Sequence, residues 1–329
     1  MSKLKYFCID DIEPFPPFPE DGKKEYNDLM ALWLTECAIL AYEHPQKVMG
    51  ELASQGFTRV IFFNDSASQG FLACHPEYKN PKKSFAILAF RGTETEDYKN
   101  ILTDVIVLKR PLDALYKTDS NECGMVHGGF LTALNNIWGS CLLDVDKVPE
   151  IKIEYIGTKG VGDAIEMIHQ NNSRLYVTGH SLGGAMATLA AYRLKKKYPV
   201  KAMYTVGSPR VLSHGAVEID SDPCPYYRIV NAQDLVPRVP LFGFQHVGQE
   251  VYLTKAGEKG VNPFNEKFLK WLTLWGMIVM IIATMCGIEQ KKCGNLPSVA
   301  PEHLLAKYFV AQNAFACHLG EQFGIPSFL

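Results

Sequence analysis

The chain has 329 residues, of which 47% are hydrophobic and 21% charged, and its formal net charge is −2. This ordinary globular composition excludes a disordered chain, a collagen-like rod and a polytopic membrane protein. Lys and Arg (33) balance Asp and Glu (35) without a long run of one sign, which argues against a nucleic-acid partner. At this length the chain can bury a full core without a disulfide scaffold.

The predicted elements alternate between helices and strands along most of the chain. Residues 14–19 (PFPPFP) hold four prolines and predict an extended strap, and residues 25–42 predict an amphipathic helix. Strands are predicted at 59–63, 70–74, 84–90, 174–179, 200–207, 226–231 and 250–254. Further helices are predicted at 127–143, 160–169 and 182–198. This alternation predicts an α/β fold with a mostly parallel central sheet flanked by helices.

Cysteine usage and the N-terminal residues bear on the compartment. The nine cysteines are an odd number and include no CxxC pair, so neither a zinc ribbon nor a thioredoxin-type motif is predicted. The first residues carry no apolar core of a secretory signal. We therefore expect reduced thiols in a cytoplasmic protein, with peripheral membrane contact and export without an N-terminal signal left open.

Residues 179–183 read Gly-His-Ser-Leu-Gly, a G-x-S-x-G motif. An apolar run precedes it and a helix rich in small residues follows, which is the context that a nucleophile elbow requires. The glycines let a sharp turn form, and this turn lifts Ser181 Oγ out of the sheet and aims the Leu182 N–H at an oxyanion. We predict Ser181 as the nucleophile and His180 as a packing residue. The alternative is a glycine-rich connection without chemistry.

The extended motif GHSLGGA resembles the elbow of the class 3 (fungal-type) lipases of the α/β-hydrolase superfamily. Further blocks agree in order over roughly residues 84–254: FRGTET at 90–95, VHGGF at 126–130, TVGSPR at 205–210, NAQDLVPRVP at 231–240 and HVGQE at 246–250. The resemblance implies a serine carboxylester hydrolase, similar to triacylglycerol lipases, that uses a Ser-Asp-His triad and an acyl-enzyme. It implies no cofactor and no metal.

The remaining triad members should follow Ser181 in the order acid, then histidine. Asp234 in NAQDLVPRVP matches the position of the family's acid, although an Asp there could also simply form a turn. Glu218, Asp220 and Asp222 are the fallback acids, and they lie in no motif. His303 opens HLLAKYF, which resembles the family's late histidine block, and we predict it as the base; His246 and His318 stay open as alternatives.

The second oxyanion donor is expected in the loop after the strand at 84–90. Thr93 in FRGTET offers a backbone N–H there, beside that of Leu182. By position, residues 95–108 resemble the family's amphipathic lid. The implied partner is a lipid or ester substrate, with peripheral lipid contact through 95–108 and 271–288. The oligomeric state is left open.

An uncharged apolar segment at 271–288 (WLTLWGMIVMIIATMCGI) stands apart. As a helix it would reach ~27 Å, which is just enough to span a bilayer. A span would put His303 on the opposite side from Ser181 and would force His246 into the role of base. The alternatives are an apolar flap or hairpin near the active site, or a buried helix. We expect a single domain over 1–329, with an N-terminal strap and helix at 1–55 and an apolar insertion at about 256–300.

Two further hypotheses about function stay open. The same machinery would serve a phospholipase A1-type enzyme, a short-chain esterase or an acyltransferase, because acyl length and head group are selected by pocket shape. A hydrolase-fold binding protein without catalysis is the alternative of another class.

Overall fold

The computed structural model describes residues 6–7, 15–19, 25–65, 68–75, 84–92, 109–111, 124–139, 154–155, 160–170, 174–195, 197–219, 224–231, 234, 236–240, 243–254 and 258–262. The predicted lid at 95–108 and the apolar segment at 271–288 lie outside these ranges. Among the described residues, no helix is long and apolar enough to cross a membrane. The single-domain assignment for 1–329 stays a prediction.

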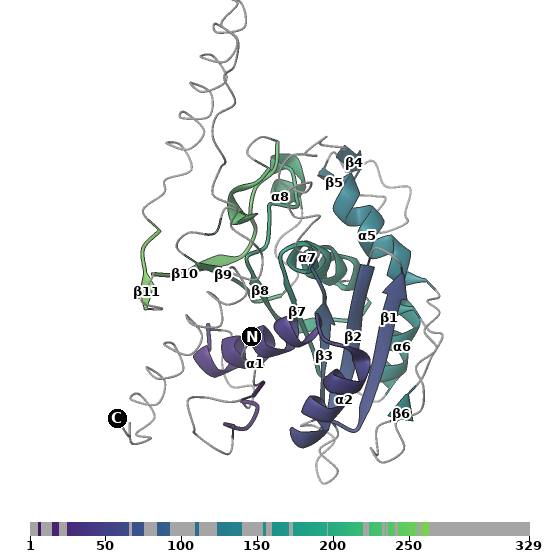
Figure 1. The fold of residues 1–329 in the computed structure, drawn as a ribbon. Coiled ribbons are helices and arrows are strands. Elements are labelled where there is room, and N and C mark those ends of the chain that lie inside the picture. Colours follow the sequence, from purple (N-terminus) through teal and green to yellow (C-terminus); the bar gives the residue numbers. More distant parts are fainter. Residues whose placement is uncertain are drawn as a thin grey trace, which may run out of the picture.

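Nine strands of the described chain form one sheet in the order β11-β10-β9-β8-β7-β3-β2-β1-β6 (Figure 1). From β3 to β10 the neighbours run parallel, whereas β1, β2 and β3 pair in antiparallel fashion. The strands are β1 (Arg59–Asp65), β2 (Ser68–His75), β3 (Phe85–Phe90), β6 (Glu154–Tyr155), β7 (Arg174–His180), β8 (Val200–Val206), β9 (Tyr226–Asn231), β10 (Gln249–Leu253) and β11 (Lys259–Gly260). The prediction of a mostly parallel central sheet is confirmed.

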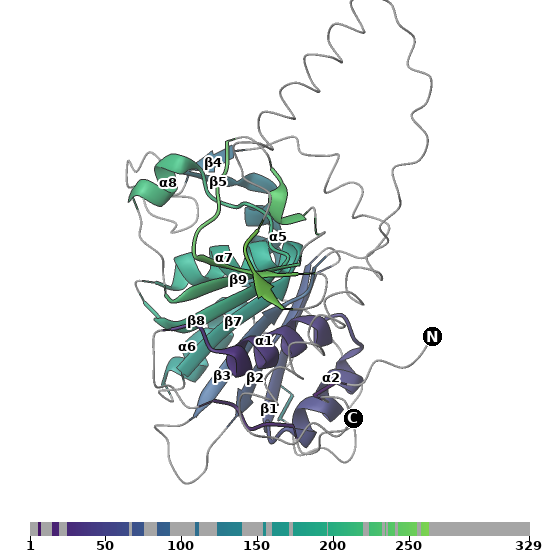
Figure 2. The same cartoon turned by 90° about the vertical axis from the view of Figure 1, so that its left-hand side faces the viewer.

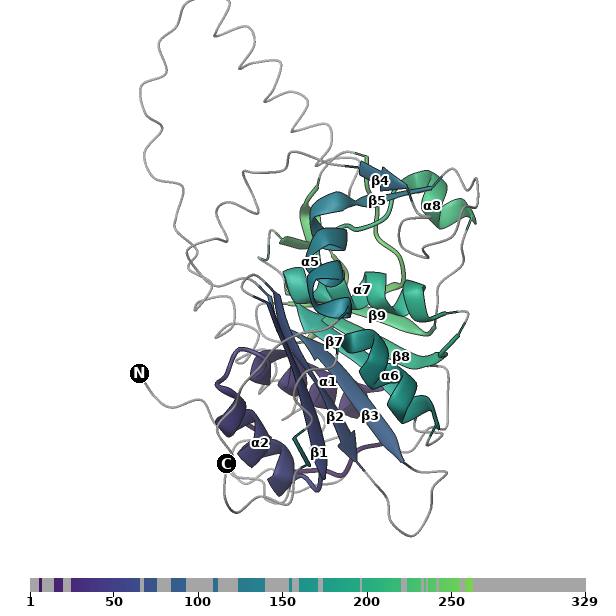
Figure 3. The same ribbon diagram turned by 90° about the vertical axis from the view of Figure 1, so that its right-hand side faces the viewer.

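Helices cover both faces of this sheet. Figure 3 shows α1 and α2 on one side and α5, α6 and α7 on the other. These helices are α1 (Asp28–Leu40), α2 (Pro45–Ser54), α5 (Gly128–Trp138), α6 (Val161–Gln170) and α7 (Leu182–Leu194). The central strands are apolar on both faces for this reason: in β3, Ile87 packs in the core beneath α1, and its neighbour Leu88 packs in the core beneath α7.

A small layer lies at one end of the sheet, where Figures 1 and 2 show β4, β5 and α8 together. It consists of β4 (Lys109–Pro111), β5 (Met125–His127) and α8 (His214–Ile219). Leu212, which follows β8, bridges Val126 on one side and Gln245 on the other. The small layer therefore lies at the carboxyl end of the central strands.

Most predicted elements occur with small shifts in their ends, and two helices of the described chain, α2 and α8, were not predicted. The helix after the elbow, α7, ends at Leu194 rather than at 198. The longer of the two, α2, begins with Pro45 after an N-cap at His44 and buries Val48, Met49 and Leu52. Proline at the first helical position and this apolar spacing are helix signals that the sequence does contain.

The helix α1 is buried all round because the N-terminal strap covers its outer side. Trp33 donates from Nε1 to the Pro16 carbonyl at 3.0 Å and contacts the rings of Phe7, Phe15 and Phe18. The extended form predicted for the prolines is confirmed over residues 15–19, which have no regular secondary structure. The amphipathic pattern predicted for this helix is therefore wrong, because every residue from Met30 to Leu40 is buried between the sheet and the strap.

Glu36 lies on α1, and its carboxyl group is buried beside the N-terminal segment, with 2% of the residue exposed. The Phe7 N–H donates to its Oε2 at 3.3 Å. Burial raises the pKa of Glu36 to about 8, and the Phe7 hydrogen bond opposes this rise only in part. The folded protein therefore holds a proton that the unfolded chain releases at lower pH.

This proton makes stability depend on pH. Because the folded pKa of Glu36 lies above its ordinary value, its contribution is full at acidic pH and is lost as the pH rises toward 8. Glu36→Gln should remove a slope of up to about 1.4 kcal/mol per pH unit between about pH 5 and 8. Urea unfolding of both proteins at several pH values measures this difference. A wild type and variant with parallel pH profiles would contradict it, and Glu166→Gln, at an exposed carboxyl, is the matched control.

Candidate active site

Ser181 lies in the sharp turn between β7 and α7. Its backbone angles are φ 55° and ψ −122°, in the left-handed half of the map that side chains rarely adopt. Its N–H donates to the Val206 carbonyl of β8 at 3.0 Å, which ties the turn to the sheet. Such a conformation costs on the order of 1–3 kcal/mol and persists only where the surrounding structure enforces it.

The motif glycines allow three backbones to meet at this turn. A Cβ on Gly183 would overlap the Phe90 carbonyl group at the end of β3 and would lie 2.9 Å from the Arg91 carbonyl carbon. A Cβ on Gly179 would overlap the Gly183 carbonyl group on the opposite side of the turn. The steric reason given for G-x-S-x-G therefore holds at both positions.

Adding one methyl group at Gly183 should push apart the backbones of the elbow and of the end of β3. Gly183→Ala is expected to cost at least about 2 kcal/mol of unfolding free energy, because the Cβ meets backbone that cannot rotate away. Gly50→Ala is the matched control: it lies in α2 with nothing within 4 Å of an added Cβ, so stability should rise by about 0.5–1 kcal/mol. Urea unfolding separates the two, and equal effects would contradict this account.

The Ser181 side chain makes no hydrogen bond to any described residue. The residue is 2% exposed, and Oγ is buried without a hydrogen-bond partner among the described residues. Leu182 is the first residue of α7, so its N–H has no intrahelical acceptor and points out at the positive end of the helix. A hydroxyl and a free donor thus lie side by side at the end of β7.

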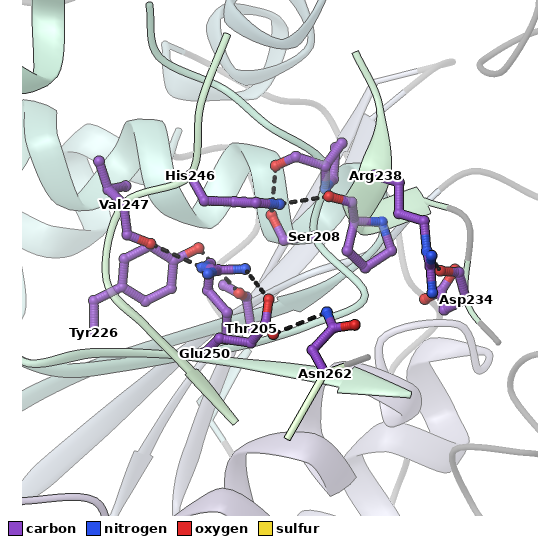
Figure 4. Close-up of polar contacts among 12 residues, drawn as sticks. Thr205, Ser208, Tyr226, Asp234, Arg238, His246, Val247, Glu250 and Asn262 are labelled. Carbon is purple, nitrogen blue, oxygen red and sulfur yellow. Dashed lines mark hydrogen bonds and ion pairs between the residues drawn. The ribbon is translucent and has the colours of Figure 1, made fainter. Parts of the chain in front are cut away.

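Asp234 lies just beyond the end of β9 and is 2% exposed. Its N–H donates to the Asn231 carbonyl at 2.9 Å, and its Oδ1 accepts the Val236 N–H at 2.9 Å. Arg238 donates from Nε to the Asp234 carbonyl at 3.1 Å, as Figure 4 shows. The predicted acid is therefore a buried carboxyl group in a tight turn.

Arg210 fastens this turn to the segment after β8. Its N–H donates to the Val239 carbonyl at 2.8 Å, and its Nη1 donates to the carbonyls of Arg238 at 2.6 Å and Pro240 at 3.0 Å. Arg210 belongs to the TVGSPR block, but sequence reasoning assigned it no role. The structure explains the arginine at this position, because its guanidinium donates to the carbonyls of both Arg238 and Pro240.

The strand order places the candidate residues at one edge. Ser181 follows β7, Asp234 follows β9, and β8 lies between them, so two strand spacings separate their strands, roughly 10 Å. On the other side of β7, β3 ends at Phe90 and leads into Arg91 and Gly92. Thr93 and His303 lie outside the described residues. The described chain thus brings together Ser181, Leu182 and the loop before Thr93, with Asp234 two strands away.

Two described histidines have their own contacts. His246 meets the Pro237 carbonyl through Nε2 (Figure 4), and burial together with the charges of Arg228 and Arg210 holds its pKa well below the usual range. His180 is 4% exposed and its Nδ1 lies 2.9 Å from the Tyr42 hydroxyl. The packing role predicted for His180 agrees with this burial. His318, the remaining candidate base, lies outside the described residues.

A second polar cluster, part of which Figure 4 shows, connects β9 to β8, to α7 and to the segment that leads into β10. Arg228 on β9 donates from Nε to the Val247 carbonyl at 2.9 Å and lies 3.5 Å from Glu250. Tyr226 OH lies 3.0 Å from the hydroxyl groups of both Thr188 and Thr205. Among the described residues, no group of three or more His, Cys, Asp or Glu side chains could hold a metal ion.

Comparisons with known proteins show the family of this chain. The family described as Lipase (class 3) matches residues 87–244. A relative named secreted mono- and diacylglycerol lipase A, from Penicillium cyclopium, is 36% identical over 227 residues, which are 67% of this chain and 64% of that protein. The chain belongs to the class 3 lipase family.

Two further matches extend the comparison. An Arabidopsis thaliana protein named phospholipase A(1) DAD1, chloroplastic, is 28% identical over 171 residues, which are 47% of this chain and 33% of that protein. The crystal structure of a mutant form of a Penicillium cyclopium protein, MDLA, matches with a TM-score of 0.50 and 24% identity, over 68% of this chain and 78% of that one. That structure shows the shared α/β-hydrolase fold. The chain spans less than two thirds of the length of these curated relatives.

The expectation of a cytoplasmic protein is wrong, because the Penicillium relative of this chain is named as secreted. That expectation rested on the composition of the first residues and on the odd cysteine count. Neither observation determines the compartment in which a protein works. Cys37, for example, is a free cysteine with 0% exposure, and a thiol buried in this way stays unpaired whatever the redox state outside.

Proposed function

We propose that this protein is a serine carboxylester hydrolase, a lipase that cleaves acylglycerol esters. The observation that carries the proposal is Ser181, held at a strained elbow with a buried Oγ that no described residue binds, next to the N–H of Leu182. A serine hydroxyl without a hydrogen bond to the described residues can accept a histidine base and attack an ester carbonyl. The name of the Penicillium relative, a mono- and diacylglycerol lipase, supports the substrate class.

In the proposed reaction, Ser181 Oγ attacks the carbonyl carbon of the ester while His303 takes the hydroxyl proton. The N–H groups of Thr93 and Leu182 hold the negative oxygen of the tetrahedral intermediate. The C–O bond to the alcohol then breaks, and His303 returns the proton to the leaving alcohol. Water hydrolyses the acyl-enzyme with His303 as the base, which releases the carboxylic acid. Asp234 orients the imidazole and stabilises its positive charge.

The arrangement of the strands supports Asp234 as the acid. A base must bridge the ends of β7 and β9, and an imidazole with nitrogens on opposite sides of its ring suits that task. Arg210 and the Val236 N–H fix the acid's turn, so its carboxylate would not need to reorganise during the reaction. His246 is a poorer candidate than His303, because Pro237 occupies the Nε2 that would have to take the serine proton.

We further propose contact with a lipid surface through residues 95–108 and 271–288, within a single domain over 1–329. Both segments lie outside the described residues, and their composition supports the proposal: one is amphipathic, and the other is uncharged over its whole length.

A phospholipase A1-type activity is the second candidate function. The Arabidopsis relative named phospholipase A(1) favours it over a short-chain esterase or an acyltransferase. The two candidate functions share the chemistry proposed above and differ in the head group that the substrate carries. A matched pair of substrates, a diacylglycerol and a phosphatidylcholine with the same acyl chains, would separate them by kcat/KM.

Covalent labelling and an ester series test the proposed function together. A fluorophosphonate should phosphonylate Ser181, and mass spectrometry of the peptide that contains it should show the adduct. Hydrolysis of p-nitrophenyl esters from acetate to palmitate should rise toward the longer chains for a lipase, whereas a short-chain optimum would indicate a plain esterase. A folded protein that is neither labelled nor active on any ester would overturn the proposal and favour a hydrolase-fold binding protein.

A further inference from the structure

Tyr42 stands directly behind the candidate site, two residues after the end of α1. Its hydroxyl lies 2.9 Å from His180 Nδ1 and accepts a hydrogen bond from the Gly92 N–H. These two partners lie on different elements. His180 ends β7 and precedes Ser181, whereas Gly92 belongs to the loop after β3 and precedes Thr93.

These elements leave no room for a side chain at Gly92. A Cβ on Gly92 would overlap the Tyr42 hydroxyl and would lie 2.6 Å from the His180 carbonyl oxygen and 3.3 Å from Ser181 Cβ. The loop after β3 therefore packs against the elbow itself, with the Tyr42 hydroxyl as the third surface. A shift of Tyr42 would be transmitted to both neighbours, because neither has free room to absorb it.

The charge state of His180 suits a shared hydrogen bond. Burial lowers the pKa of His180 to about 4, so the imidazole is neutral at physiological pH. The Tyr42 hydroxyl therefore meets the Gly92 N–H and one imidazole nitrogen without any buried charge. The Tyr42 ring also contacts Arg91, whose guanidinium carbon lies 5.5 Å from the ring centroid. Arg91 Nη1 in turn donates to Gln69 Oε1.

We propose that Tyr42 is a positioning residue that holds the loop after β3, at Gly92, against the elbow at His180, and so sets the spacing between the donor proposed on that loop and the Leu182 N–H. This inference rests on the proposed function. Both donors must lie about 2.7–3.1 Å from one oxygen to act together, yet they belong to separate elements. The β3–β7 ladder ends at Phe90 opposite Gly179, short of either donor. The Tyr42 hydroxyl joins the two chains beyond that point.

Tyr42→Phe removes only the hydroxyl and keeps the ring. We expect kcat for ester hydrolysis to fall about 10- to 100-fold with KM changed less than about twofold, because the misplaced donors serve the transition state rather than the bound substrate. A boronic acid, which forms a tetrahedral adduct with the nucleophile, should bind more weakly by a similar factor. A merely structural role would not weaken this inhibitor in step with kcat.

Tyr204→Phe is the matched control. Tyr204 is another buried tyrosine whose hydroxyl accepts a backbone N–H, that of Asn27 at 3.0 Å, and this N–H belongs to the N-cap of α1 rather than to the elbow. Both variants should lose similar stability, and only Tyr42→Phe should lose kcat. If Tyr42→Phe does not fold, His180→Phe removes the other end of the contact and should give the same loss of kcat. If both fold, the double variant should lose little more than either one.

The outcomes separate this inference from the proposed function. A wild-type protein that neither takes the fluorophosphonate nor cleaves esters would refute the proposed function itself. An active wild type with unchanged kcat and inhibitor affinity in Tyr42→Phe would refute the role of Tyr42 alone. The positioning role of Tyr42 is refuted equally if only KM changes, or if Tyr204→Phe loses as much kcat as Tyr42→Phe.

Discussion

Ser181→Ala should lower kcat for ester hydrolysis by about 10⁴- to 10⁶-fold, the loss typical of removing a serine nucleophile. Ser181 Oγ is the atom that would form the acyl-enzyme. Stability should stay the same or rise by up to about 1 kcal/mol, because the variant deletes a buried hydroxyl that no described residue binds. Initial rates with a p-nitrophenyl ester and urea unfolding measure the two effects.

Ser208→Ala is the control for this prediction. Ser208 is also 2% exposed, and its Oγ donates to the Pro209 carbonyl at 3.3 Å on the segment after β8. This variant should retain most of its kcat and should lose rather than gain stability. If Ser181→Ala keeps more than about a tenth of the wild-type kcat, Ser181 does not act as the nucleophile.

Asp234→Asn should lower kcat by about 10⁴-fold, because an amide holds the base in the wrong tautomer and cannot balance the charge of the imidazolium. The amide oxygen can still accept the Val236 N–H, and Arg210 still holds the turn. We therefore expect the folded structure to survive. Steady-state rates should show the loss in kcat, and circular dichroism should show an unchanged spectrum.

The fallback acids provide the controls for this second prediction. Asp220→Asn and Asp222→Asn should stay within about twofold of the wild-type kcat, as is usual for residues that do not touch the reacting groups. A large loss in either of them, together with an active Asp234→Asn, would move the role of acid away from Asp234.

The local sequence was sufficient for the elements that form the centre of the fold. The strand at 84–90 is a continuous apolar run after Ser84, and the strand at 174–179 is apolar from Leu175 to Val177. Such runs suit a sheet that is covered on both faces. The elbow could also be predicted, since the need for glycine at 179 and 183 follows from the sharpness of the turn between strand and helix. The residues of α2 include the signals of a helix start, but the helix was not predicted because its apolar pattern is short.

Only the tertiary structure revealed the contacts that hold the candidate site together. Tyr42 and His180 lie 138 positions apart, and no motif includes the tyrosine. Arg210 was visible within a block, but its bonds to the carbonyls of Arg238 and Pro240 depend on how the segment after β8 meets the turn after β9. Periodicity and turn sterics are properties of neighbouring residues, so a sequence displays them. The spacing of two donors on separate strands depends on packing between distant residues, and only the folded chain determines it.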